Sequence, residues 1–258
     1  MSRLLKALLV VIALVTIPSL LSLGYRLIYG HGNSLMGNLP RFIVWAWDRP
    51  EDLRFLKEDE AGIAVLLAYV RVEGEQSVRV ERRKHPMYLT PKTPLIAVVR
   101  IETSKPRWTF DQRKQALDGL KAVFDDSSVP KAVQIDFDAT EIERSGYASL
   151  LQDLRRDLPK RLPISITALA SWCMGDNWIR ALPVDEAVPM LFRMGPDGPA
   201  VRRAIESGDD LNEELCRGVA GISTDEPLKV KDWLGRVYFF HPEPWTRAAF
   251  DKAVEPFQ

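Results

Sequence analysis

The stretch Ala132–Thr140, AVQIDFDAT, decides how the rest of the chain is interpreted. Its apolar residues alternate with Gln134, Asp136 and Asp138, which predicts a strand that carries three polar side chains on one face. Burying an unpaired carboxylate is costly, so two carboxylates at the end of a strand either line a cleft or have partners. We therefore expect Asp136 and Asp138 to mark a functional edge of a sheet.

The composition is typical of a globular domain with a large core. Of the 258 residues, 46% are hydrophobic and 27% are charged. Lys and Arg together number 35, as do Asp and Glu, so no basic surplus indicates a nucleic-acid partner. The two cysteines and three histidines show no metal-ligand spacing, and we expect no cofactor. A cation held by Asp136 and Asp138 stays an open alternative.

The N-terminal residues differ in kind from the rest. Arg3 and Lys6 precede an almost charge-free apolar run, Ala7–Leu23, that is long enough to cross a bilayer as a helix. Residues 1–30 are therefore predicted to be a signal anchor that holds the protein in the membrane. Because Pro18–Leu23 matches a cleavage site poorly, an uncleaved anchor is favoured, with cleavage and secretion as the alternative.

The positive flank of the anchor predicts that the remainder lies outside the cytoplasm, on the periplasmic face of an inner membrane. That compartment permits a disulfide between Cys173 and Cys216, although their spacing alone does not show that they are close. Residues 31–39 are expected to form a linker, and residues 40–258 a single domain.

Eight apolar segments predict the strands of this domain. They are Arg41–Trp47, Gly62–Ala68, Leu95–Glu102, Lys131–Asp138, Pro163–Leu169, Ala187–Met194, Gly218–Ser223 and Arg236–His241. Most are followed by a helical pattern and joined by short loops, so an α/β fold with a single (β/α)8 barrel of the TIM type is the simplest architecture. The alternative is an open α/β sheet, but Trp47–Pro50 stands where a dinucleotide-binding fold has its glycine-rich turn.

The segments between the predicted strands carry patterns that predict helices and one hairpin. Thr109 and Gln112 form a capping-box pattern at the start of an amphipathic helix, and Pro159 ends a second helix. A short helix is expected at Glu51–Lys57. A hairpin is expected from Val78–Glu81 and Met87–Leu89, and the remaining helices at 171–180, 200–206 and 245–254.

Polar and aromatic residues gather at the predicted carboxyl ends of the strands, where barrels of this type form their sites. They are Trp47, Asp48, Tyr69, Arg100, Glu102, Asp136, Asp138, Ser171, Trp172, Arg193, Asp225, Glu226, His241, Glu243 and Trp245. Carboxylates for proton transfer beside indoles that stack on sugar rings are typical of a carbohydrate site. The sequence therefore predicts a polysaccharide as partner.

Within this set we assign roles to four acids. Asp138 is the predicted general acid or its partner, and Asp136 tunes its pKa, because neighbouring carboxylates resist ionising together. Asp225 or Glu243 is the predicted nucleophile or base.

The substrate-binding set also has structural alternatives. The set is Trp47, Asp48, Arg100, Glu102, Trp172, Arg193, His241 and Trp245. Asp136 and Asp138 could instead form structural ion pairs with Arg100 or Arg193, and Trp47 and Trp245 could serve packing. Asp225 and Glu226 could begin a helix, which is the favoured interpretation for Glu226.

Three stretches carry a resemblance: Val133–Thr140 (VQIDFDAT), Pro163–Trp172 (PISITALASW) and Val184–Gly195 (VDEAVPMLFRMG). Together they resemble an uncharacterised bacterial family, a domain of unknown function in secreted or anchored proteins with a glycoside-hydrolase-like barrel. The first stretch also resembles, more loosely, the fourth strand of chitinase-type glycosidases, which carries a D-x-D-x-E motif. Asp136 and Asp138 match its aspartates, but Thr140 stands in the place of the glutamate, and Glu141 comes one residue late.

Three hypotheses follow from the sequence. The first is an anchored extracytoplasmic barrel that acts on a polysaccharide as a glycoside hydrolase. The second is a glycan-binding barrel without catalysis, which Thr140 favours. The third is a structural or assembly protein of the cell envelope, for which the acids would be paired internally and the barrel mouth filled.

Overall fold

The computed structural model describes residues 35–57, 59–74, 76–105, 107–126, 130–209, 211–228 and 235–257. The predicted signal anchor and residues 31–34 of the predicted linker lie outside the described residues and stay predictions, while residues 35–38 of the linker form a 3-10 turn. Within the described residues, the chain forms no helix with both the length and the apolar character that a bilayer span requires. The sheet belongs to the compact unit that begins at Asn38.

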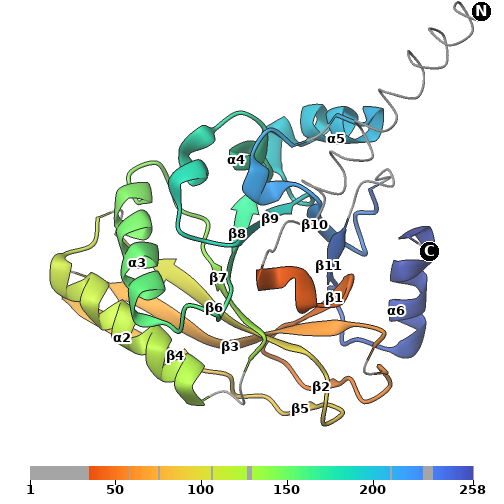
Figure 1. Cartoon of the computed structure of the whole chain (residues 1–258), viewed down its shortest axis with the longest axis horizontal. Coiled ribbons are helices and arrows are strands. Elements are labelled where there is room, and N and C mark those ends of the chain that lie inside the picture. Colours follow the sequence, from red (N-terminus) through yellow and green to blue (C-terminus); the bar gives the residue numbers. More distant parts are fainter. Residues whose placement is uncertain are drawn as a thin grey trace, which may run out of the picture. The chain divides into compact units, whose positions relative to one another are not determined.

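Eight parallel strands of the described chain close into a barrel. In the order in which they pair, they are β1 (Phe42–Ala46), β3 (Gly62–Glu73), β6 (Leu95–Thr103), β7 (Ala132–Asp136), β8 (Ile164–Leu169), β9 (Glu186–Met190), β10 (Val219–Ser223) and β11 (Arg236–Phe240). The pairing of β11 with β1 and of β1 with β3 completes the circle. The predicted barrel and its eight predicted strands are confirmed, and the open sheet is excluded (Figure 1).

Helices cover the barrel unevenly. The two longest, α2 (Phe110–Asp126) and α3 (Arg144–Asp157), follow β6 and β7. The shorter ones are α4 (Ala170–Met174), α5 (Gly198–Ser207) and α6 (Arg247–Val254), with 3-10 turns η1 (Leu35–Asn38), η2 (Asn177–Ala181), η3 (Gly195–Asp197), η4 (Glu214–Cys216) and η5 (Glu255–Phe257). The predicted capping box is confirmed, since the Gln112 N–H donates to the Thr109 hydroxyl and the Thr109 N–H to the Gln112 carbonyl oxygen.

Two local predictions are wrong. Glu51–Lys57 is not a helix, because β2 (Glu51–Asp52) pairs in parallel with β5 (Met87–Tyr88), and the buried Glu51 carboxylate accepts hydrogen bonds from Arg49 and from the Trp245 N–H. The expected hairpin does not form either. Instead, β4 (Ser77–Arg82) pairs antiparallel with the far end of β3, which runs well past its predicted end.

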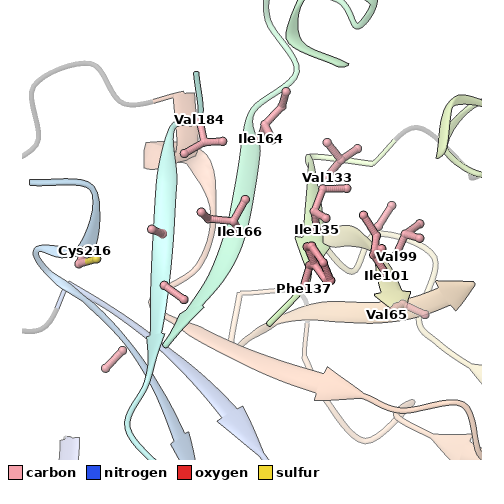
Figure 2. Packing of buried hydrophobic residues seen from close by; sticks show 14 of the residues in the cluster. Val65, Val99, Ile101, Val133, Ile135, Phe137, Ile164, Ile166, Val184 and Cys216 are labelled. Carbon is pink, nitrogen blue, oxygen red and sulfur yellow. The ribbon is translucent and has the colours of Figure 1, made fainter. Parts of the chain in front are cut away.

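The alternation in the stretch 132–140 sorts its side chains between the two faces of the barrel wall. Val133, Ile135 and Phe137 belong to the apolar cluster under the helices, and Figure 2 shows them on the same side of β7. On the other face, Gln134 donates to Ser165 of β8 at 2.9 Å.

This inward face carries a polar network that crosses the barrel. The Ser165 hydroxyl donates to Glu186 of β9, and Glu186 also accepts from Tyr238 of β11 at 2.7 Å. Because β10 separates β9 from β11 in the sheet, these side chains meet inside the barrel. Below the mouth, the barrel interior therefore contains a cluster of hydrogen-bonded side chains.

Cys173 of α4 and Cys216 of η4 form a disulfide, with Cα atoms 5.9 Å apart, and both are buried. The bond joins the segment that follows β8 to the segment that precedes β10, across the outside of β9.

Candidate active site at the barrel mouth

Asp136, the last residue of β7, is a buried carboxylate with two strong partners. Arg100 lies opposite it in the register of β6, and its Nη1 donates to Asp136 Oδ2 at 2.6 Å. The hydroxyl of Thr167, on β8, donates to the other oxygen at 2.8 Å. Only 2% of Asp136 is exposed, so these neighbours supply the compensation that a buried charge needs.

Asp138 lies just beyond the strand and is far more open, with 44% of its side chain exposed. Its Oδ2 accepts a longer hydrogen bond, 3.3 Å, from Nη2 of the same Arg100. Burial of the carboxyl and, next, the negative charge of Asp136 raise the pKa of Asp138, although Arg100 opposes them. The pair therefore consists of a buried carboxylate held by an arginine and a more open carboxyl group whose pKa is raised.

An open depression of about 590 Å³ lies beside Asp138. It is lined by Arg100, Ile101, Glu102, Thr103, Ser104, Lys105, Phe137, Asp138, Thr140 and Glu143. These residues come from the carboxyl ends of β6 and β7 and from the loops that follow, which is where the sequence places the acid pair. The mouth is thus hollowed at this point, and its surface is rich in groups that bind hydroxyls.

Glu143 is a residue of the depression that the sequence analysis missed. Its carboxylate accepts hydrogen bonds from the Thr140 N–H at 2.8 Å, from the Thr140 hydroxyl at 2.6 Å and from the Thr103 hydroxyl. The pattern T-x-x-E before a helix is the signal that would have found it, because a capping box brings these two residues together. Glu141 is exposed in the turn between them.

A second group of predicted residues follows β9 and β10. The Ser223 hydroxyl donates to Asp225, and this hydrogen bond holds the pKa of Asp225 below its usual value. Arg193 pairs with Asp225 at 3.4 Å, and the Arg193 N–H donates to Glu226 at 2.9 Å. Of these residues, none is among those that line the depression beside Asp138.

A third group follows β11. The ring of His241 lies against Trp245 and its Nδ1 is hydrogen bonded to the Thr224 hydroxyl at 2.5 Å, while burial lowers the pKa of His241. Glu243 is exposed, and its backbone carbonyl accepts a hydrogen bond from Arg49.

The tryptophans correct part of the predicted substrate-binding set. Trp172 is 1% exposed and packs edge-on against Trp178, with ring centroids 4.8 Å apart. Trp245 is also buried, and its indole N–H donates to the Trp45 carbonyl at 2.9 Å. Neither ring has an open face, so neither position allows the predicted stacking on a sugar. Trp47 is partly exposed and retains that prediction.

Two further predicted residues have polar partners. The Asp48 carboxylate accepts from the N–H groups of Lys84 and His85 at 3.0 and 3.2 Å, which fixes the loop after β1 against the loop before β5. Glu102 pairs with Arg100 at 3.7 Å and with Arg71. Among the described residues, no three or more His, Cys, Asp and Glu side chains are arranged to hold a metal ion.

The fold and its mouth define a parallel (β/α)8 barrel with an acid pair at the carboxyl end of the fourth barrel strand. Residues 91–188, from the segment before β6 into β9, match the family described as Domain of unknown function (DUF3142). The predicted resemblance to a family of this kind is confirmed. No curated protein matches the chain.

Three solved structures are similar to the chain. The chitinase domain of the spore coat protein CotE from Clostridium difficile has 13% identity and a TM-score of 0.44, over 74% of this chain and 67% of that chain. A family GH18 chitinase from Chromobacterium violaceum has 9% identity and a TM-score of 0.48, over 86% and 83%. The spore cortex-lytic enzyme SleL of Bacillus cereus has 14% identity and a TM-score of 0.42, over 72% of this chain and 51% of that one.

Proposed function

We propose that the barrel hydrolyses a polysaccharide, with Asp138 as the general acid. The observation that carries the proposal is the acid pair: two carboxyl groups share one arginine, yet one is buried and the other faces an open depression with a raised pKa. Environments that separate two neighbouring acids in this way are typical of proton transfer near neutral pH.

In this mechanism Asp138 donates its proton to the oxygen of the bond that breaks. The negative charge of Asp136 favours the protonated form of Asp138, and Arg100 holds both carboxyl groups in place. Asp225 and Glu243, which follow β10 and β11, are the proposed sources of the second carboxylate. Trp47, Asp48, Glu102, Arg193 and His241 remain proposed substrate contacts.

The proposed location is outside the cytoplasm, held by the predicted anchor at the membrane. The supporting observation is the Cys173–Cys216 disulfide, because such bonds persist mainly in oxidising compartments.

The test is turnover by the purified full-length protein on a panel of bacterial polysaccharides, measured as new reducing ends. We expect Asp138→Asn to lower the rate on the responsive polymer by at least about 100-fold, the size usual for loss of a general acid. Asp118→Asn is the matched control, since Asp118 is an exposed aspartate paired with Lys114 on α2. Full activity of the Asp138 variant would contradict the assignment.

A second function, glycan binding without turnover, is favoured by Thr140. Its hydroxyl donates to Glu143 in the place where the chitinase-type motif has a glutamate. This function predicts saturable binding of one polymer with no product, weakened by Trp47→Ala and unaffected by Asp138→Asn. Binding that depends on Asp138, or any turnover, would exclude it. The open depression argues against the third hypothesis, which requires a filled mouth.

A further inference from the structure

A ladder of alternating charges crosses the sheet beside the mouth. β3 and β6 continue past the barrel, and β4 adds a further strand to their extension. On this extension, Arg79 of β4 pairs with Glu81 at 3.1 Å, and Glu81 pairs with Arg71 of β3 at 3.0 Å. Arg71 also pairs with Glu102, its register neighbour on β6. The charges thus alternate along this series of ion pairs, from Arg79 and Glu81 on β4 through Arg71 on β3 to Glu102 on β6.

The inner end of the ladder is Arg100, whose guanidinium is shared three ways. Its Nε lies 3.7 Å from Glu102 Oε1, while Nη1 and Nη2 bond to Asp136 and Asp138 at 2.6 and 3.3 Å. Glu102 therefore contacts the Nε side of the guanidinium, and the two aspartates bind its Nη1 and Nη2 groups. The weakest of the hydrogen bonds is the one to Asp138, so this bond responds first when the other partners of Arg100 change.

We propose that Glu102 and Arg71 are positioning residues that act on Asp138 through Arg100. Arg71 holds Glu102, and Glu102 competes with Asp138 for the guanidinium. The ladder therefore sets how strongly the Arg100 guanidinium interacts with the Asp138 carboxyl group. This role rests on the proposed function of Asp138, but its effect on Asp138 can be measured without any substrate.

The order of the ion pairs in the ladder gives the direction in which each substitution changes the pKa of Asp138. Without Glu102, Arg100 turns fully to the aspartates, and the pKa of Asp138 falls. Without Arg71, Glu102 is released to bind Arg100, and the pKa of Asp138 rises. The other charged and titratable groups near Asp138 are Asp136 of β7, Tyr147 and Glu143 at α3, and Lys105 in the loop after β6, and neither substitution changes them.

The experiment is an NMR titration of the Asp138 carboxyl in the full-length protein labelled at aspartate, with Asp138→Asn to assign the signal. We expect Glu102→Gln to lower the midpoint, and Arg71→Gln to raise it, by about half a pH unit each, the size of one partly screened neighbouring charge. The decisive variant carries both changes. If Arg71 acts only through Glu102, the double variant titrates like Glu102→Gln alone.

Simple long-range attraction gives a different result, because the two shifts would then add and cancel in the double variant. That outcome, or no shift in either single variant, would overturn the proposal. Arg156→Gln removes the same charge at an exposed position of α3, outside the ladder, and should leave the midpoint unchanged. Arg71→Lys, which keeps the charge but loses the fork between Glu81 and Glu102, should give a smaller rise and serves if Arg71→Gln does not fold. If the midpoints shift in the expected directions but the protein shows no turnover, the positioning role holds and the proposed hydrolysis does not.

Discussion

The two sides of the barrel are covered by different means. The long helices α2 and α3 follow β6 and β7 (Figure 1), and α2 packs against β3, β4 and β6. The buried apolar residues of both helices belong to the same core cluster as those of the strands. Over β9 lie the short α4 and the 3-10 turn η4, and there the Cys173–Cys216 disulfide joins them. A short helix buries little apolar area, so a covalent link contributes here what packing contributes on the other side.

The barrel also differs between the strands that carry the acid pair and strands β1 and β11. At β6 and β7 it carries Arg100 and the acid pair, whereas the barrel near β1 and β11 carries stacked rings, with Trp45 and Phe240 4.6 Å apart. At β6 and β7 the buried charge of Asp136 is compensated by Arg100 and Thr167, while at β1 and β11 ring packing is combined with polar contacts such as the hydrogen bond from the Trp245 indole to the Trp45 carbonyl. One regular barrel thus places the acid pair at one part of its wall and a cluster of aromatic rings at another.

The disulfide should have the largest effect. It closes a loop of 43 residues, for which chain entropy gives about 4 kcal/mol. We expect the variant Cys173→Ala/Cys216→Ala to lose about 3–4 kcal/mol of unfolding free energy in urea. Wild-type protein under reducing agent should match the variant, and the variant itself should not respond to that agent. An unchanged midpoint would show that the short helices need no covalent link.

A core substitution under the long helices should come next. Leu151 of α3 is fully buried, and Leu151→Ala removes three carbons and leaves a cavity, which costs about 3 kcal/mol. Leu169→Ala, at a partly exposed leucine, is the control and should cost well under that. If the two sides are independent, the cost of Leu151→Ala is the same with the disulfide reduced or oxidised. Strong coupling in calorimetric or urea unfolding would contradict the separation of the two sides.

The barrel could be predicted because periodicity and length decide it. Eight apolar segments separated by short loops specify eight strands, and the alternation at 132–140 specifies which face of β7 is polar. The failures lie where tertiary contacts override local pattern. Glu51 has the surroundings of a helix start in sequence, yet its buried carboxylate binds Arg49 and the chain at Trp245, nearly two hundred residues away.

The arrangement of the candidate site could be predicted in part for the same reason. The proximity of Asp136, Asp138 and Arg100 could be predicted because strand ends of parallel neighbours meet at one edge, and their role in a site stays a prediction. Trp172 was misplaced, since sequence does not show whether an indole after a strand turns to the mouth or into the core. Glu143 was missed, although its capping-box spacing is visible in the sequence. The sharing of Arg100 among three acids depends on register, which no pattern in the chain displays.

An ion pair should contribute less than the disulfide on the side with short helices. Arg247 of α6 donates to Glu60 before β3, and this hydrogen bond lowers the pKa of Glu60 to about 2. A carboxyl group whose pKa is lower in the folded than in the unfolded protein stabilises the fold at a pH above its unfolded-state pKa. For Glu60 that stability is lost as the pH falls from about 4.5 through about 2. We expect Glu60→Gln to cost about 1 kcal/mol at pH 7, because the pair is partly exposed. The difference from wild type should shrink toward pH 2 in urea unfolding, and a difference independent of pH would contradict this role.

The smallest expected effect is a gain, on the side that carries the acids. The pKa of Asp138 is raised by burial and by Asp136, so the folded protein binds a proton that the unfolded chain has already released. The free energy of unfolding therefore falls as the pH rises from the pKa of Asp138 in the unfolded chain through its raised pKa in the folded protein. Above the folded-state pKa it stays at the lower value. We expect Asp138→Asn to stabilise the protein by a few tenths of a kcal/mol at pH 7, since the carboxyl is partly exposed, and to have no effect below pH of about 3. Destabilisation by Asp138→Asn at neutral pH would mean that its bond to Arg100 outweighs its burial, and that the charged side of the mouth is built for stability rather than for proton transfer.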